Sequence, residues 1–294
     1  MSYGIFLGLT CVDMVYYQDD FPQENHKSRT TDFVCRIGGP AANAAVTYAK
    51  LGGKAKLYTC IGKSTMGAWL KAELAKCNVE VIDFAQDCEQ NPCISTIIVN
   101  EETGTRTIFS GQTNYAAHLH ATDETSIPGS VITSAVKAEL AGALFLCTDG
   151  NLYEPAGEIV TQAWKMGKHI IMDGGSYKEH TDVFLDAATE LIASEVFLPP
   201  QYEDITYLIV PHNIGYFAIT HGDKPTEWWD YYEVGHHSHG FITPPQVKAV
   251  DTLGAGDVLH GAYCYYRMNE QESIEHALEK ATKIASESVT HRGI

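Results

Sequence analysis

Asp251-Thr252-Leu253-Gly254-Ala255-Gly256-Asp257 is the most informative segment of the chain. It lies between a strand candidate at residues 247–250 and an apolar run at 258–268 that has the pattern of a helix. Three consecutive small residues let the backbone turn tightly, and their amides then converge at a helix N-terminus, where the helix dipole favours an anion. A carboxylate at Asp257 would stand beside this anion cradle, placed to accept a proton from an attacking hydroxyl group. The alternative is a tight turn in which Asp257 only caps the helix.

A second glycine element, Ile37-Gly38-Gly39-Pro40-Ala41-Ala42-Asn43, opens a predicted helix at residues 40–51. Its two glycines permit close approach of a ligand to the backbone, and proline suits the first turn of a helix. The amide of Asn43 can bind a hydroxyl group. An equally simple interpretation is that Asn43 caps or packs the helix.

The segment Gly62-Lys63-Ser64-Thr65 resembles part of a P-loop, because it follows a predicted strand at 55–61 and precedes a predicted helix at 66–77. A P-loop also requires a glycine five positions before Gly62, and this chain has Leu57 there. Without that glycine the loop cannot wrap a triphosphate. We therefore expect Lys63 to be a solvated loop residue.

The order of the predicted elements indicates the fold class. Strand-like apolar runs alternate with helical runs, which predicts a parallel sheet covered on both faces. The further strand candidates are residues 5–11, 79–84, 143–147 and 169–172, and a further helix candidate is 156–166. Two polar, strand-like segments at 14–34 and 93–110 break this alternation and predict a small additional sheet. The aromatic and histidine-rich segment at 228–239 predicts an exposed hairpin or loop.

The composition limits the class of protein. A chain of 294 residues with 45% hydrophobic content can form one main domain with a large core. Its 37 acidic and 20 basic residues give a formal charge of -17, which argues against nucleic acid and anionic membrane surfaces as partners. The first residues do not have the pattern of a secretion signal, and no segment is apolar enough to span a bilayer. Eight cysteines without a Cys-x-x-Cys pair favour reduced thiols in a cytoplasmic protein.

The two glycine elements, in this order and about two hundred residues apart, resemble the two signatures of the PfkB family of ribokinase-like carbohydrate kinases. The resemblance extends to Gly8-Leu9-Thr10-Cys11-Val12-Asp13, to Arg106-Thr107 and to Ile219-Thr220-His221-Gly222. It implies an α/β, three-layer ribokinase-like fold with a mainly parallel sheet flanked by helices. Residues 1–294 would form a single kinase domain, with a small β-sheet lid from about 14–34 and 93–110.

The resemblance also implies roles for particular residues. Asp257 would be the catalytic base, with an anion hole formed by Gly254, Ala255 and Gly256. The sugar hydroxyls would be bound by Asp13, Gly38, Gly39 and Asn43, and ATP would contact Thr220 and Gly222. Asp251, with the carbonyl of Leu253, would help to bind a monovalent cation such as K⁺.

The sequence departs from the family pattern at the magnesium motif. The Asn-x-x-Glu motif of the family appears here as Pro200-Gln201-Tyr202-Glu203, so Glu203 is retained and the asparagine is absent. Because magnesium is held largely by waters and phosphates, the loss should weaken the positioning of the metal rather than abolish transfer. Ser64 also replaces an aspartate that is usual in the family.

The sequence thus predicts an ATP-dependent kinase that transfers the γ-phosphate to a hydroxyl of a sugar or sugar-like substrate. It would use Mg²⁺ and form a homodimer through the lid. Two alternatives remain open at this point. One is a nucleoside kinase of the same fold, and the other is a sensor that binds sugar or nucleotide without catalysis.

Overall fold

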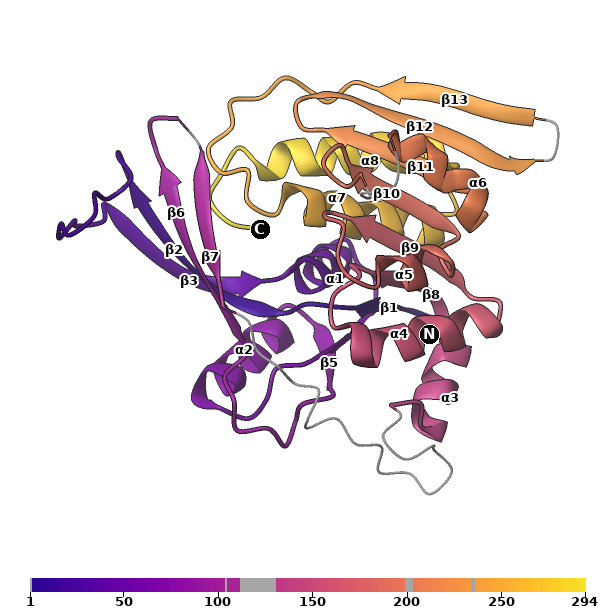
Figure 1. Cartoon of the computed structure of the whole chain (residues 1–294), viewed down its shortest axis with the longest axis horizontal. Helices are drawn as coiled ribbons and strands as arrows, with labels where there is room; N and C mark the ends of the chain where they lie inside the picture. Colours follow the sequence, from indigo (N-terminus) through magenta and orange to yellow (C-terminus); the bar gives the residue numbers. More distant parts are fainter. Residues whose placement is uncertain (1, 104, 112–130, 199–202, 234–235) are drawn as a thin grey trace.

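The computed structural model describes residues 2–103, 105–111, 131–198, 203–233 and 236–294. These residues form a nine-stranded sheet and a separate four-stranded sheet beside it (Figure 1). The larger sheet has the order β13-β12-β11-β10-β9-β8-β1-β4-β5. Its strands are β1 (Tyr3–Leu7), β4 (Ala55–Thr59), β5 (Val79–Asp83), β8 (Ala143–Thr148), β9 (His169–Gly174), β10 (Glu190–Ser194), β11 (Tyr216–His221), β12 (Lys224–Glu233) and β13 (His236–Ile242).

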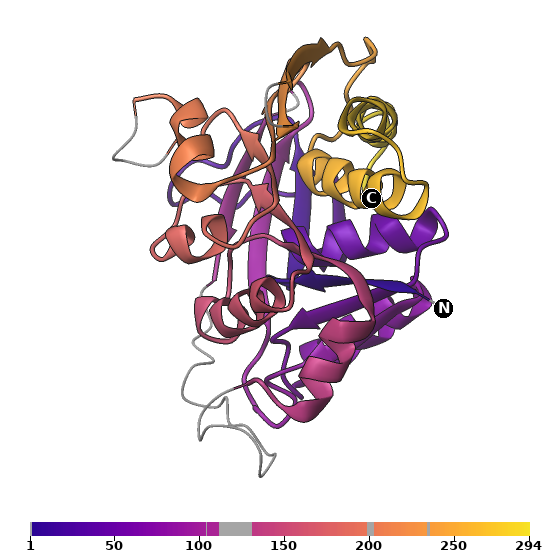
Figure 2. The same cartoon turned by 90° about the vertical axis from the view of Figure 1, so that its right-hand side faces the viewer.

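The larger sheet is parallel from β5 to β11, and the hairpin of β12 and β13 extends it in the antiparallel sense. Side chains alternate between its two faces, so that Ile5 and Leu7 join one buried cluster while Phe6 joins the other. Helices cover both faces, which gives three layers (Figure 2). On one side lie α1 (Pro40–Lys50), α2 (Thr65–Lys76), α7 (Ala255–Cys264) and α8 (Ile274–Ser288); on the other lie α3 (Ser134–Gly142), α4 (Tyr153–Lys165) and α5 (Thr181–Leu185). The short helix α6 (Ile209–His212) precedes β11.

The sequence predicted most of these elements, and two of its predicted strands differ from the structure. The expected strand at 247–250 is irregular chain, with Val247 and Val250 both more than 40% exposed. It follows two prolines at 244 and 245 and pairs with none of the described strands. The expected strand at 5–11 ends at Leu7, because the chain leaves the larger sheet there and enters the smaller one at Cys11.

The four-stranded sheet, which we call the small sheet, has the order β3-β2-β6-β7. Its strands are β2 (Cys11–Gln18), β3 (Asp32–Gly38), β6 (Cys93–Asn100) and β7 (Arg106–Ser110). One face, the inner face, carries Asp13 and the buried residues Val15 and Tyr17, and packs against Leu253. The two polar segments predicted from sequence therefore do form a sheet beside the main one.

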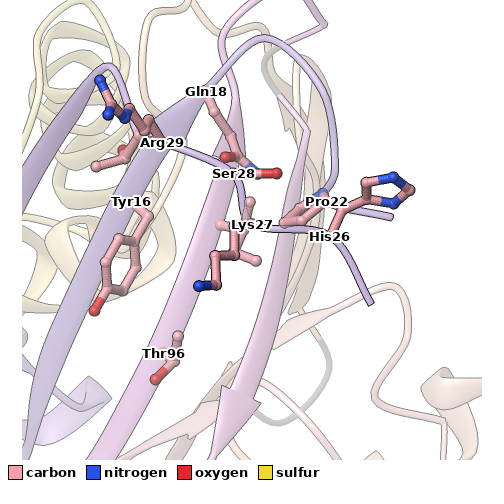
Figure 3. A pocket seen from close by; sticks show the side chains of 10 residues that line it. Tyr16, Gln18, Pro22, His26, Lys27, Ser28, Arg29 and Thr96 are labelled. Carbon is pink, nitrogen blue, oxygen red and sulfur yellow. The ribbon is translucent and has the colours of Figure 1, made fainter. Parts of the chain in front are cut away.

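The opposite, outer face of the small sheet carries a pocket of about 800 Å³ beneath the segment that joins β2 to β3. Figure 3 shows Lys27 lying over the sheet between Tyr16 and Thr96, whereas His26 and Arg29 point in other directions. Because Tyr16 and Asp13 differ by an odd number of positions along β2, their side chains lie on opposite faces. The pocket is therefore separated from Asp13 by the sheet itself.

Helices α1 and α7 pack in direct contact on one face of the larger sheet. A Cβ atom at Gly261 of α7 would lie 2.3 Å from the carbonyl oxygen of Ala44 in α1, so only glycine allows this approach. None of the helices within the described residues is both long and apolar enough to cross a membrane.

Candidate active site

The segment 251–257 forms the turn that the sequence predicted, and α7 begins at Ala255, three residues earlier than expected. Gly254 caps the helix with φ of +80°, a left-handed conformation that favours glycine. A Cβ atom at Gly256 would meet no other atom within 4 Å, so the backbone faces open space there. Exposed amides at a helix N-terminus are the arrangement that binds an anion.

Asp257 in the first turn of α7 is joined to the second glycine element. The side-chain amide of Asn43 donates a hydrogen bond of 2.7 Å to a carboxylate oxygen of Asp257. The pKa of Asp257 is raised to about 7, first by burial of the carboxyl group and then by the negative charge of Asp173, while Asn43 and His260 act in the opposite direction. The two signatures of the sequence thus meet at one carboxyl group.

Two further carboxylates, which sequence reasoning missed, lie at the ends of parallel strands behind Asp257. Asp149 follows β8 and accepts hydrogen bonds from the backbone amides of Leu9 (2.9 Å) and Ala41 (3.1 Å). It therefore ties the end of β1 to the start of α1. Asp173 lies near the end of β9, and its charge raises the pKa of Asp257. In the sequence, each of these aspartates is directly followed by a glycine at the end of an apolar strand, and this pattern could have indicated their place at the site.

His260, also not predicted, lies one turn after Gly256 within α7. Its Nδ1 is 2.7 Å from the carbonyl oxygen of Gly256, and its Nε2 is 3.1 Å from that of Ile192. The same Nδ1 lies 3.5 Å from a carboxylate oxygen of Asp173.

Asp13 lies on the inner face of the small sheet and is 6% exposed. Burial raises its pKa, and the thiol of Cys11 donates a hydrogen bond of 3.2 Å to one of its oxygens. A Cβ atom at Gly38 would lie 2.2 Å from the Asp13 carboxyl, so glycine leaves room for this group. Gly39 has φ of +96° and packs directly on the backbone of Leu9. Both glycines are therefore required by the folded chain itself.

Asp251 is buried, and its carboxylate accepts several hydrogen bonds. The guanidinium of Arg36 donates from Nη1 and Nη2 to one carboxylate oxygen, at 3.2 Å each, and the hydroxyl of Tyr17 lies 3.3 Å from the same oxygen. The backbone amide of Leu253 donates to the other oxygen at 2.9 Å. Arg36 and Tyr17 belong to the small sheet, so these contacts connect that sheet to the turn before α7.

A cavity of about 620 Å³ extends from the turn before α7 to the turn between β11 and β12. Thr220 and Gly222, which the sequence assigned to nucleotide binding, both line it, together with Ala255 and Gly256. Arg106 of the small sheet also lines it and donates a hydrogen bond of 2.7 Å to the hydroxyl of Thr252. We call this space the nucleotide-side cavity.

Two acidic residues line the nucleotide-side cavity: Glu195, which follows β10 directly, and Asp223, in the turn between β11 and β12. The pKa of Glu195 is lowered, chiefly by a hydrogen bond with His221, whose Nδ1 is 3.0 Å away. Glu203, the residue predicted from the magnesium motif, is exposed and is not part of this lining. The preceding residues of that motif, 200–202, lie outside the described residues.

The segment that resembles a P-loop has its amides occupied by protein. Asp83 accepts hydrogen bonds from the amides of Ile61 (2.9 Å) and Gly62 (3.0 Å). Lys63 is exposed and forms an ion pair of 3.1 Å with Glu89. The expectation that Lys63 is a solvated loop residue is therefore supported.

Comparison with known proteins agrees with this geometry. The family model described as "pfkB family carbohydrate kinase" matches residues 1–170 and 207–294. The chain belongs to the pfkB family. Carbohydrate kinases of this family are phosphotransferases that act on hydroxyl groups, so the resemblance noted from the two glycine signatures is confirmed.

Individual relatives of the pfkB family resemble the chain over nearly its whole length. The deoxyribokinase of Salmonella typhimurium is 23% identical over 300 residues, which cover 98% of this chain and 92% of the relative. The ribokinase of Giardia lamblia superposes with a TM-score of 0.83 at 17% identity, covering 100% of this chain and 94% of that one. The ribokinase of Arabidopsis thaliana, solved with ribose and ATP, gives a TM-score of 0.73 at 16% identity, with coverage of 100% and 94%. These likenesses confirm the predicted fold class.

Proposed function

We propose that this carbohydrate kinase transfers the γ-phosphate of ATP to a hydroxyl group of a sugar, with Asp257 as the base. The observation that carries the proposal is the hydrogen bond between Asn43 and Asp257. It places the carboxyl group of the second glycine signature beside the amide of the first. An acceptor hydroxyl bound by Asn43 would therefore lie within reach of the carboxylate that takes its proton.

The pKa of Asp257 suits this role. At a pKa of about 7 the carboxyl group is partly ionised at neutral pH, and it is a stronger base than an exposed aspartate. The acceptor proton passes to Asp257 as the acceptor oxygen bonds to phosphorus, and the bond to the ADP oxygen breaks. The amides at Gly254, Ala255 and Gly256 would stabilise the charge on the transferred group.

The sugar would bind between the small sheet and α1. We assign its hydroxyl groups to the carboxylate of Asp13, the backbone at Gly38 and Gly39, and the amide of Asn43. Support comes from the inward position of Asp13 on β2 and from the space that Gly38 leaves around its carboxyl group. The small sheet would act as a lid that excludes water, which is itself a phosphoryl acceptor.

ATP would occupy the nucleotide-side cavity. Thr220 and Gly222 line its far end and Gly256 its near end, so a nucleotide there can present its γ-phosphate at the first turn of α7.

Magnesium bound with ATP supplies neutralising charge on the phosphates. Glu195 and Asp223 both line the same cavity, so either carboxylate would fit that group. The role predicted for Glu203 stays a prediction. The family resemblance implies a monovalent cation at Asp251, but the carboxylate of this residue forms an ion pair with the guanidinium of Arg36.

We also propose that two copies of the chain associate through the lid in the cytoplasm. The small sheet exposes large apolar side chains, with Phe33 and Phe109 47% and 57% exposed. Their burial against a second copy would remove apolar surface and cover strand edges. The eight cysteines are all unpaired, which suits a reducing compartment.

The proposal is tested by measuring ADP release with ATP, Mg²⁺ and panels of aldoses, ketoses, phosphosugars and nucleosides. We expect turnover with at least one sugar, and turnover about 10³-fold slower with the Asp257→Asn variant. The matched control is Lys63→Met, which removes an exposed cation outside the site. A preference for nucleosides, or silence of the wild-type protein with every acceptor, would overturn the proposal.

A further inference from the structure

The pair formed by Arg36 and Asp251 is an ion pair enclosed within the protein. The side chain of Arg36 is 14% exposed and that of Asp251 is 3% exposed. Two nitrogens of the guanidinium share one oxygen of the carboxylate, and no other cationic group is recorded within ion-pair distance of Asp251 among the described residues. Arg36 is thus the positive charge that compensates this carboxylate.

A monovalent cation does not fit the same carboxylate. Such an ion requires oxygen atoms whose lone pairs are not used by other donors. One oxygen of Asp251 already accepts from Arg36 and from Tyr17, and the other accepts from Leu253, which leaves this carboxylate a single lone pair for an ion that needs several oxygen ligands. The neighbouring carbonyl oxygen of Val289 is also engaged, because it accepts from the amides of residues 250 and 251. An added ion would moreover stand next to the largely buried guanidinium of Arg36, and like charges in such an environment repel more strongly than in water.

Arg36 is also held in a defined position. It lies in β3, directly opposite Asp13 in the pairing of β2 with β3. The backbone of Gly293, which follows α8, also lies against the guanidinium, since a Cβ atom at Gly293 would be 3.3 Å from Nη1 of Arg36. Because Gly293 has φ of +85°, this close turn is one that glycine adopts without strain.

We propose that Arg36 is a fixed, built-in cation that positions the turn at 251–256 and makes a diffusible monovalent cation unnecessary in this kinase. The inference rests on the proposed function for its kinetic part. Arg36 is a positioning residue: it holds Asp251, whose carboxylate holds the amide of Leu253, one residue before Gly254. Arg36 belongs to the small sheet, which is the proposed lid, and lies opposite Asp13 in it. The guanidinium therefore contacts the turn only when the lid and Asp13 are in place over the site.

The test compares KCl, NaCl and tetramethylammonium chloride at equal ionic strength, with Arg36→Met, Arg36→Lys and the control Lys63→Met beside the wild-type protein. The thermal midpoint of unfolding is measured first, because it requires no catalysis. We expect the wild-type midpoint to be the same in all three salts, and Arg36→Met to have a lower midpoint that KCl raises selectively. With the acceptor found above, the wild-type kcat should differ by less than about twofold among the salts.

Arg36→Met should lower kcat about tenfold or more with little change in the KM for ATP, and guanidinium or K⁺ should restore part of it. Arg36→Lys should retain more activity than Arg36→Met because it keeps the charge. The inference fails if K⁺ raises the midpoint or the kcat of the wild-type protein severalfold over tetramethylammonium, or if Arg36→Met keeps full kcat. If no acceptor is turned over, the proposed function fails while the unfolding measurements still decide the role of Arg36.

Discussion

Asn43 and Asp257 are separated by 214 positions in the chain, yet the amide nitrogen of one lies 2.7 Å from the carboxylate of the other. Each residue lies near the start of a helix that follows a glycine turn, and the two helices pack side by side. The same contact therefore brings together the side-chain amide of Asn43, a carboxyl group of raised pKa and the open backbone of Gly256.

Replacing Asp257 by asparagine should lower kcat by about 10³-fold, because the variant keeps the shape of the side chain but cannot take the acceptor proton. The KM for ATP should change little, since Asp257 is not among the residues that line the nucleotide-side cavity. Steady-state ADP release with the preferred acceptor measures both constants. Turnover close to that of the wild type would remove Asp257 from the mechanism.

The pH dependence of the reaction should reflect the raised pKa of Asp257. The base is active when ionised, so kcat/KM should rise with pH through about 7 and then level off. An exposed aspartate would instead give a profile that is already flat above about pH 5. The profile is measured from pH 5 to 9 at constant ionic strength. A rate that does not change between pH 5 and 8 would contradict the assignment.

The same carboxyl group should make stability depend on pH. Its pKa is about 7 in the folded chain and close to 4 when unfolded, so the folded state binds more protons between these values. Its contribution to stability is therefore present below about pH 4 and is lost as the pH rises to about 7. Asp257→Asn should be more stable than the wild type at pH 8, by on the order of 2 kcal/mol, and the difference should shrink towards pH 4. Urea denaturation at several pH values measures this difference; equal stabilities at pH 8 would argue against burial of the carboxyl group.

Replacing Gly38 by alanine should weaken binding of the acceptor. The added Cβ atom would lie 2.2 Å from the carboxyl group of Asp13, which must then move. We expect the KM for the sugar to rise about tenfold or more with a smaller change in the KM for ATP. Gly157→Ala in α4 is the matched control, because the nearest atoms to its Cβ belong to the movable side chain of Tyr153. An unchanged KM for the sugar in Gly38→Ala would show that Asp13 does not contact the acceptor.

Sequence alone predicted the parts of the site that depend on local backbone chemistry. The turn before Asp257 follows from three small residues ahead of an apolar helix, and the start of α1 follows from a proline after two glycines. Thr220 and Gly222 were placed by resemblance, and both line the nucleotide-side cavity. These features depend on short segments of the chain, so they can be predicted from the sequence without knowledge of the fold.

The residues that were missed depend on which distant segments meet. Asp149 matters because β8 lies beside β1, and His260 because the carbonyl of Ile192 lies above α7. Arg36 gave no signal in the sequence, since its partner is 215 positions away. The wrong strand at 247–250 has the same cause: its apolar pattern is genuine, but no neighbouring strand is available to pair with it among the described residues.

The glycine contact between α1 and α7 has a consequence for how such an enzyme acquires new substrates. Gly261 packs against the backbone of Ala44 so closely that even a methyl group would not fit between the two helices. This contact fixes the distance between α1 and α7. Under the proposed function, every alcohol that is phosphorylated would therefore deliver its reacting oxygen to the same point. Selection among alcohols would then depend on those side chains of the small sheet that do not contact the turn at 251–257, and these could be exchanged one at a time without disturbing the geometry of transfer.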